Sequence, residues 1–176
     1  MPGRVSGPAG PPEPGPPEPG RPETGYRAQF EPAMRLALSL AAGVPGDVPV
    51  GAVVLDRDGA VAGRGANRRE ADGDPTAHAE VVALRAAARS LGGWRLDGAT
   101  LVVTLEPCAM CAGAVLAARV SRLVYGAADD RAGAAGSRWD LLHDRRLGPP
   151  VEVLGGVLAA DCAALLREFF GQRRVR

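Results

Sequence analysis

The sequence predicts an α/β fold of three layers, in which a mixed sheet of five strands carries helices on both of its faces. Two observations lead to this prediction. Two short apolar runs flank the turn residues Asp-Arg-Asp-Gly at 56–59, and this arrangement indicates a hairpin early in the chain. After the hairpin, helical and strand patterns alternate, which predicts crossover connections between parallel strands. The 176 residues, of which 46% are hydrophobic, suffice for one domain with its own core.

The individual elements follow from residue spacing. A helix is predicted over 31–42, because Met34, Leu38 and Ala41 recur at helical intervals. The run Thr-Leu-Val-Val-Thr-Leu at 100–105 is apolar on both faces and indicates a buried strand. The other predicted elements are strands over 50–55 and 60–67, a helix over 76–89, an Ala-rich helix over 108–118, a strand beginning at 123–125, a strand over 151–154 and a helix over 159–170.

The segment 1–25 differs from the rest of the chain. It is rich in proline and glycine and carries the repeat Pro-Pro-Glu-Pro-Gly twice, without the regular glycine of collagen. Because it has almost no apolar side chains to bury, we expect it to stay disordered or extended. A dispensable tail is favoured over a ligand for a proline-recognising partner. The folded domain is expected over 26–176.

Charge, cysteine content and hydropathy indicate the cellular compartment of the protein. The net charge of +1 favours neither a nucleic acid partner nor its absence. Three cysteines, two of them in a C-x-x-C pair, do not suggest a disulfide framework. No run approaches the roughly twenty apolar residues of a membrane span, and the N-terminus lacks an apolar signal segment. We therefore expect a cytoplasmic protein without a membrane partner.

Two short motifs carry the chemistry. The string "TAHAE" ends at Glu80 and the string "LEPCAMC" ends at Cys111. Together they supply His78, a carboxylate two residues later, and a Pro-Cys-x-x-Cys that begins near Cys108. This pattern is the signature of zinc-dependent deaminases that act on an amino-substituted nucleobase. Both motifs are expected in the first turn of a helix, where the helix dipole favours a zinc-binding thiolate.

The ligand set indicates a catalytic rather than a structural zinc site. One nitrogen and two sulfurs leave a fourth tetrahedral position for water, whose pKa zinc lowers toward about 7. Glu80 is then the expected proton shuttle. A redox role for the C-x-x-C pair leaves the His-x-Glu unexplained. A structural site needs a fourth ligand, but Cys162 is expected in the core and His143 lies in a polar stretch.

Beyond these motifs, the chain from near Phe30 to Arg174 resembles the bacterial tRNA-specific adenosine deaminases, which convert the wobble adenosine of an anticodon to inosine. The strings that carry the resemblance are "DVPVGAVV", "ANRR", "DPTAHAE", "TLEPCAMCAGA", "GAADDRAGAAGS" and "CAALLREFFGQRR". The resemblance implies the deaminase fold, one zinc ion per subunit, a homodimer, and the anticodon stem-loop of tRNA as partner.

The resemblance also implies roles for individual residues. It places the zinc ligands on His78, Cys108 and Cys111, the proton shuttle on Glu80, nucleotide contacts on Asn67, Ala79 and Asp129, and tRNA backbone contacts on Arg173 and Arg174. Taken alone, Asn67 is also a typical turn residue and Asp129 a typical loop acid. A terminal charge run such as Arg173-Arg174 is often simply solvated. Phe169 and Phe170 are expected either in the core or beside the RNA.

Three positions depart from the family's pattern. Ala128 stands where an Arg is expected, which weakens the case for phosphate contacts in that loop. Arg131 stands where a Lys is common and preserves the charge. Gly171 is expected to fray the last helix before Arg173 and Arg174.

The expected reaction is hydrolytic deamination of adenosine at position 34 of tRNA, by a hydroxide that zinc activates. An arginine tRNA with an ACG anticodon is the expected substrate, since an unstacked loop base is splayed into a pocket at little cost. A free-base or nucleoside deaminase, such as a guanine deaminase, is an alternative with the same metal site. A non-catalytic zinc subunit of an editing complex is another, against which the intact Glu80 argues.

Overall fold

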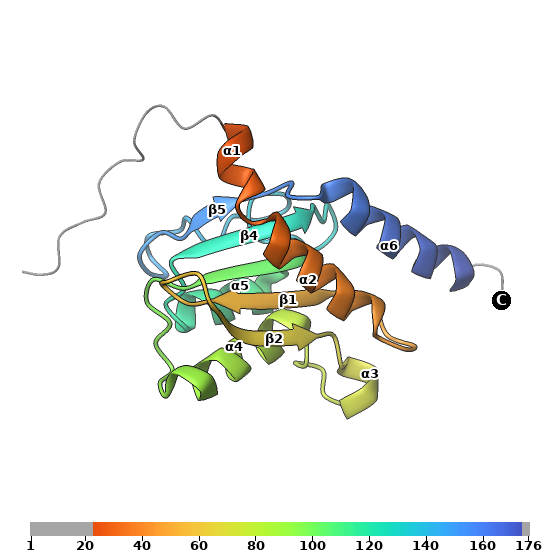
Figure 1. The fold of residues 1–176 in the computed structure, drawn as a ribbon, viewed down its shortest axis with the longest axis horizontal. Helices are drawn as coiled ribbons and strands as arrows, with labels where there is room; N and C mark the ends of the chain where they lie inside the picture. The colour runs from red at the N-terminus through yellow and green to blue at the C-terminus, as the bar shows by residue number, and fades with distance from the viewer. Residues whose placement is uncertain (1–22, 174–176) are drawn as a thin grey trace, which may run out of the picture.

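The computed structural model describes residues 23–173. Most of the predicted tail, residues 1–22, and the predicted site residue Arg174 lie outside this range. No helix within the described range is long and apolar enough to cross a membrane. The elements, shown in Figure 1, are α1 (Glu23–Ala28), α2 (Glu31–Ala42), β1 (Gly51–Leu55), β2 (Val61–Ala66), α3 (Arg69–Asp72), α4 (Ala79–Leu91), β3 (Thr100–Leu105), α5 (Ala109–Ala117), β4 (Arg122–Ala127), β5 (Glu152–Leu154) and α6 (Ala159–Arg173).

The five strands form one mixed sheet in the order β2-β1-β3-β4-β5. Strand β1 runs antiparallel to both of its neighbours, β2 and β3. Strands β3, β4 and β5 are parallel to one another. The predicted hairpin followed by parallel crossovers is therefore confirmed, and the carboxyl ends of β3 and β4 meet at one edge of the sheet.

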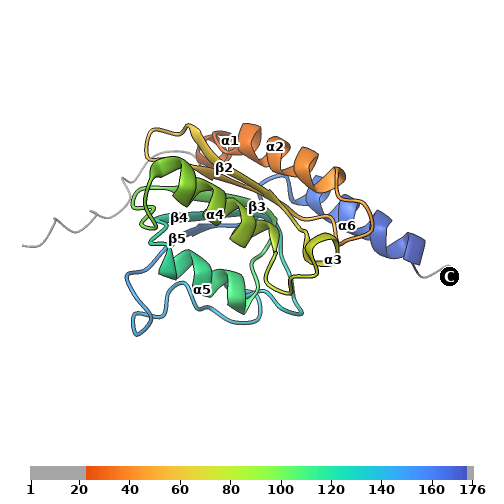
Figure 2. The same ribbon diagram turned by 90° about the horizontal axis from the view of Figure 1, so that it is seen from below.

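The helices lie in two layers, one on each face of the sheet, as Figure 2 shows. On one face, Met34 of α2 and Cys162 of α6 pack in a cluster with Val53, Val102 and Val124 of the central strands. The neighbouring strand residues point to the opposite face and pack beneath α4 and α5, as strand alternation requires. The three-layer prediction is confirmed, and so is the place of Cys162 in the core.

Helix α4 lies close against β2, and a glycine permits this approach. A Cβ atom on Gly65 would lie 2.2 Å from the carbonyl oxygen of Ala79, the first residue of α4. Any side chain at this position would therefore push the start of the helix away from the strand. Because His78 and Glu80 flank Ala79, this contact helps to set where both of their side chains lie.

Most element boundaries lie within two residues of the prediction, with two exceptions. The helix predicted from 76 begins at Ala79, because the N–H and hydroxyl of Thr76 both donate to Asp74 Oδ1 at 2.7 Å and hold a turn. Helix α6 continues through Gly171 to Arg173, so the fraying expected at Gly171 is not seen. A glycine costs a helix only about 1 kcal/mol relative to alanine. The sequence did not predict α1, which crosses the domain boundary drawn at residue 25, or the short α3.

Candidate metal centre and substrate pocket

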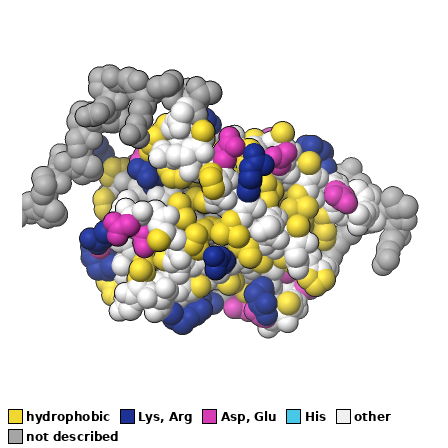
Figure 3. Space-filling view, in the orientation of Figure 1, with side chains coloured by type: hydrophobic (Ala, Val, Ile, Leu, Met, Phe, Trp, Pro, Cys, Tyr) yellow, Lys and Arg dark blue, Asp and Glu magenta, His cyan; other side chains and the backbone are white. Residues whose placement is uncertain are grey.

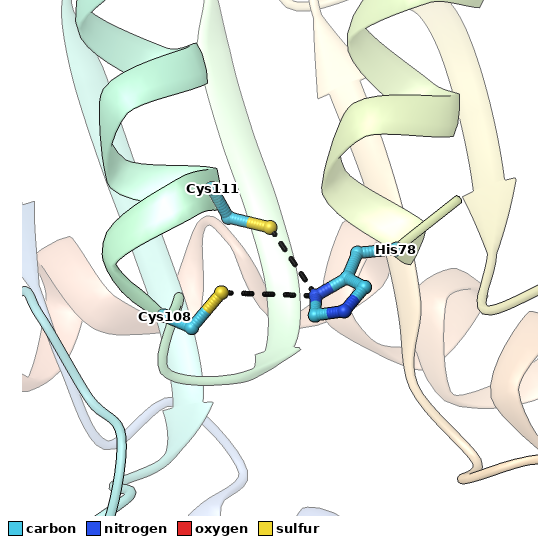
Figure 4. A group of neighbouring side chains, drawn as sticks. All are labelled: His78, Cys108 and Cys111. Carbon is cyan, nitrogen blue, oxygen red and sulfur yellow. Dashed lines mark hydrogen bonds between the residues drawn. The ribbon is translucent and has the colours of Figure 1, made fainter. Parts of the chain in front are cut away.

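The three predicted zinc ligands converge where α4 and α5 begin, as Figure 4 shows. Nδ1 of His78 lies 3.7 Å from Sγ of Cys108 and 3.5 Å from Sγ of Cys111. All three ligand atoms lie within 4.8 Å of one another. A tetrahedral zinc ion with ordinary Zn–S and Zn–N bond lengths separates sulfur from nitrogen by about 3.6 Å. The spacing and the donor set of one nitrogen and two sulfurs therefore fit a single zinc ion.

The ends of two helices position these ligands. His78 is the N-cap residue of α4 and Cys108 that of α5, both in extended conformation with ψ angles of 151° and 174°. His78 and Cys108 were predicted inside the first turn of their helices. Each lies one residue before that turn instead, because an N-cap residue is still non-helical. Neither side chain caps its own helix, so imidazole and thiol are free to face an ion. Cys111 follows in the first turn of α5.

The protonation of the two thiols is unequal. A hydrogen bond with Cys111 lowers the pKa of Cys108 to about 3, and although burial opposes this, a hydrogen bond with His78 adds to it. The hydrogen bond with Cys108, together with burial, raises the pKa of Cys111. Hydrogen bonding to Cys108 also raises the pKa of His78. One thiolate is thus present at neutral pH, and metal binding releases the remaining protons.

Glu80, the second residue of α4, lies beside this centre without belonging to the ligand group. Its side chain is 4% exposed and hydrogen-bonds to Cys111. Burial raises the pKa of its carboxyl group. A raised pKa brings a carboxyl group closer to neutral pH, where it can both take up and release a proton. The position and environment of Glu80 are those that a proton shuttle needs.

A pocket of about 160 Å³ opens beside the ligands at the carboxyl ends of β3 and β4. Residues from distant parts of the chain line it, among them Asn67, His78, Ala79, Glu80, Cys108 and Asp129. The structure thus brings the predicted substrate residues 67, 79 and 129 together with the metal centre. A larger cavity of about 630 Å³ lies at the opposite ends of β3 and β4, beside Arg119 and Arg122, and contains none of these residues.

Asn67 lines the pocket in a fixed orientation. Its Nδ2 donates to Oδ1 of Asp47 at 2.9 Å and to the carbonyl oxygen of Val48 at 3.1 Å. Its Oδ1 is buried and accepts no hydrogen bond from the described residues. Such a buried acceptor without a partner is rare in folded proteins. An N–H or O–H group of a ligand would satisfy it, which favours the substrate-contact role over that of a turn residue.

Asp47 is a site residue that the sequence did not predict. It is 3% exposed, and besides Asn67 it accepts hydrogen bonds from the backbone N–H of Val48 at 2.8 Å and of Glu70 at 2.9 Å. A single carboxylate therefore joins the loop before β1 to the segment after β2. The only local signal was an acidic residue directly before the apolar run at 48–55.

Glu106 is a second residue that the sequence missed. It is 2% exposed and accepts hydrogen bonds from the backbone N–H groups of Asp129, Ala135 and Ser137, each at 3.0 Å, and from the Ser137 hydroxyl. Burial works against ionisation, but these hydrogen bonds outweigh it and lower the pKa of Glu106. The residue just before Pro107 and Cys108 thus anchors the loop that carries Asp129. Its signal was an acidic residue at the end of a buried strand.

The structure supports the predicted contact of Asp129 less directly than that of Asn67, and it describes the predicted arginine contacts only in part. Asp129 lines the pocket, but its Oδ1 also accepts hydrogen bonds from the N–H of Arg131 at 2.9 Å and of Ala132 at 3.2 Å, so it also has the expected loop role. Arg173 ends α6, whose carboxyl end projects away from the sheet in Figure 1, and its side chain lies outside the described residues. The prediction that Arg173 and Arg174 contact the tRNA backbone therefore falls on side chains outside the described residues and stays a prediction. The Phe169 and Phe170 rings meet edge to face near that end.

The metal centre agrees with the family of the chain. The family model described as the cytidine and deoxycytidylate deaminase zinc-binding region matches residues 28–127. This range contains His78, Glu80, Cys108 and Cys111. The chain belongs to this family of zinc-binding deaminases.

Within this family, the chain is similar to several characterised deaminases. The tRNA-specific adenosine deaminase of Haemophilus influenzae is 48% identical over 151 residues, which cover 84% of this chain and 87% of that protein. A solved structure from a study of A-to-I editing by tRNA:A34 deaminases is 43% identical, with a TM-score of 0.73, and covers 76% of this chain and 98% of its own. The guanine deaminase of Nitrosomonas europaea is 31% identical, with a TM-score of 0.65, over 80% and 84% of the two chains.

Proposed function

We propose that this protein deaminates the wobble adenosine of a tRNA anticodon, at position 34, to inosine. The observation that carries the proposal is a zinc-compatible ligand set with a buried glutamate at a pocket of about 160 Å³, in a chain 48% identical to a tRNA-specific adenosine deaminase. The reaction consumes water and releases ammonia, so adenosine becomes inosine without any other co-reactant.

The residues of the chain divide the work of this hydrolysis. His78, Cys108 and Cys111 would hold zinc, which when bound supplies a Lewis acid that activates water for attack at C6 of the base. Glu80 accepts one proton from the attacking water and delivers it to N1. It then takes the remaining proton from the new hydroxyl group on C6 and delivers it to the amine, which leaves as ammonia. Its burial supports this role, because a raised pKa eases both directions of proton transfer.

The substrate is held by groups on three sides of the pocket. Asn67 offers its free Oδ1 to a donor on the nucleotide. Ala79 is the first residue of α4, so its backbone N–H has no partner within the helix and is available to the base. Asp129 lines the side formed by the loop after β4, where its carboxylate is a candidate acceptor for a ribose hydroxyl.

A base from a single-stranded loop suits this site. The pocket is smaller than those that take drug-sized ligands, which occupy about 300 to 1,000 Å³, and is of the size of one nucleobase. An anticodon base is already free of pairing and is splayed out at little cost. We place the RNA at the edge of the sheet where the pocket opens. Acidic and basic side chains are interspersed on the face shown in Figure 3.

Three finer statements belong to the same proposal. The expected substrate is an arginine tRNA with an ACG anticodon, and the compartment is the cytoplasm, where tRNA is modified in bacteria. A homodimer follows from the family resemblance, and large apolar side chains that are exposed in the single chain, such as Trp94 and Trp139, support it. Light scattering of the purified protein measures the dimer directly.

The test is inosine formation in a transcript of that arginine tRNA, read by sequencing at position 34. Free guanine and free adenosine are assayed in parallel, because a guanine deaminase is among the similar structures. Inosine confined to the tRNA supports the proposal. Ammonia release from guanine with an unchanged tRNA would contradict it and would favour the free-base alternative.

A further inference from the structure

Arg69 lines the same pocket as His78 and Glu80, and it is not among the site residues predicted from the sequence. It is the first residue of α3 and is exposed. Among the described residues that line the pocket, it is the sole arginine, and the chain has no lysine there. The other ionisable groups of the lining include the carboxyl groups of Glu80, Glu106 and Asp129. Apart from the metal centre, Arg69 is therefore the one permanently charged basic side chain among the described residues that line the pocket.

The neighbouring Arg68 shows what distinguishes Arg69. The guanidinium of Arg68 donates to both carboxylate oxygens of Asp72, at 2.8 Å and 2.6 Å. Arg69 forms no ion pair with any carboxylate between residues 25 and 172, the range over which side chains are described. Of two adjacent arginines, one is thus neutralised within the protein and the other is available to an external anion.

The backbone on both sides of Arg69 is held in place. Oδ1 of Asp47 accepts from the Asn67 side chain, and Oδ2 of Asp47 accepts from the N–H of Glu70 at 2.9 Å. The N–H of Arg68 donates to the carbonyl oxygen of Ala77 at 2.9 Å, which ties the segment to the start of α4. The backbone at Arg69 is therefore fixed relative to Asn67, while its long side chain is free to reach a ligand at the mouth of the pocket.

We propose that Arg69 binds a phosphate of the RNA strand, next to the nucleotide whose base enters the pocket. This inference rests on the proposed function. In a strand, each ribose carries a phosphate on either side, so a base inside the pocket brings phosphates to its mouth. A guanidinium is suited to such a contact because its donors match phosphate oxygens. The contact positions the strand and does not read its sequence.

The experiment measures how salt affects the reaction of an anticodon stem-loop. For wild type, Arg69→Ala and Arg69→Lys, the logarithm of kcat/KM is plotted against the logarithm of salt concentration. Loss of one phosphate contact in single-stranded RNA reduces the steepness of this line by about 0.7. We expect that reduction in Arg69→Ala and a near-normal slope in Arg69→Lys, which keeps the charge. Zinc content should stay the same in all three proteins.

Arg68→Ala is the matched control. It removes the same charge from the neighbouring residue, whose side chain is already neutralised by Asp72. Its slope should equal that of wild type. Equal slopes for Arg69→Ala and wild type, or equal changes in Arg68→Ala and Arg69→Ala, would overturn the proposal. Absence of inosine with the wild-type protein would instead refute the proposed function.

A second measurement identifies the phosphate. Stem-loops are made in which a neutral methylphosphonate replaces one phosphate at a time on either side of the target adenosine. At the contacted position, the neutral linkage should weaken wild type and leave Arg69→Ala unaffected, because the partner is already missing. If both proteins respond equally to both replacements, no phosphate near the target contacts Arg69, and the proposal is wrong.

Discussion

The carboxylate of Asp47 determines how the amide of Asn67 faces the pocket. Nδ2 of Asn67 donates to Oδ1 of Asp47 at 2.9 Å, and this leaves Oδ1 of Asn67 buried and without a partner among the described residues. An amide that is free to rotate would present a donor as readily as an acceptor. Asp47 therefore helps to set which atom of the Asn67 amide is left without a partner beside the pocket.

Replacing Asp47 tests this relationship. Asp47→Ala removes one of the two acceptors of the Asn67 amide and the side-chain acceptor of the Glu70 N–H, so the free energy of unfolding should fall by about 1–3 kcal/mol. We also expect KM for the stem-loop to rise more than kcat falls, because the change reaches a binding group. Urea denaturation and steady-state kinetics measure the two effects. Asp58→Ala, on an exposed turn, is the control, and a variant at 47 with unchanged KM would contradict the role.

Glu106→Gln should weaken the fold in a pH-dependent way. The pKa of Glu106 is lowered from its ordinary value of 4.5, because its hydrogen bonds outweigh the effect of burial. Ionised Glu106 therefore stabilises the folded state above pH 4.5, and this contribution is lost as the pH falls through the folded pKa. The glutamine side chain has the same size as glutamate, but its NH₂ group would face two of the donors that now bond to the carboxylate. We expect this loss of acceptors to cost about 1–3 kcal/mol at neutral pH.

The measurement for Glu106 is urea denaturation across a pH series. The difference between wild type and Glu106→Gln should be largest at neutral pH and should shrink below pH 4.5. Glu31→Gln, which removes an exposed carboxylate paired with Arg35, is the control and should change stability little. A difference that does not vary with pH would show that the charge of Glu106 is not what anchors the loop.

Zinc content should depend on one pair of cysteines and not on the third. Cys108→Ala removes the low-pKa thiolate and is expected to lose the metal and all activity, with a lower melting temperature. Cys162→Ala changes a buried core residue and should keep about one zinc ion per chain. Elemental analysis of both purified proteins decides the matter. Zinc retained by Cys108→Ala would argue against the ligand set.

Glu80→Gln should separate metal binding from proton transfer. The amide keeps the shape of the side chain but carries no exchangeable acid proton, so kcat should fall by at least about 10²-fold. Zinc content should match wild type, because Glu80 is not in the ligand group. The melting temperature should not decrease, because burial disfavours the charged carboxylate. Substantial turnover by this variant would remove Glu80 from the mechanism.

The site residues that sequence analysis identified share one property. His78, Glu80, Cys108 and Cys111 lie in two short motifs whose spacing alone indicates a metal and a proton carrier. The strands and the longer helices followed in the same way from local periodicity, and the mixed character of the sheet followed from their alternation. Local patterns of this kind survive folding because they depend on neighbours within a few residues.

Asp47, Glu106 and Arg69 show what local patterns leave out. The Asp47–Asn67 contact spans 20 residues, and that between Glu106 and Ser137 spans 31. Most partners of the two carboxylates are backbone N–H groups, which every residue except proline carries and which therefore leave no mark in a sequence. The difference between Arg68 and Arg69 is likewise invisible until Asp72 is seen to neutralise only the first.

The sequence by itself predicted the metal ligands and the proton carrier, and it determined the alternation of elements and hence the class of fold. Only the tertiary structure decided that His78 and Cys108 stand at the N-caps of two helices, so that their side chains point beyond the helix ends toward one shared point. It also decided which polar groups surround the pocket and which of them are already satisfied. The reason is physical, since hydrogen bonds and burial depend on distances in space that residue spacing along a chain does not contain.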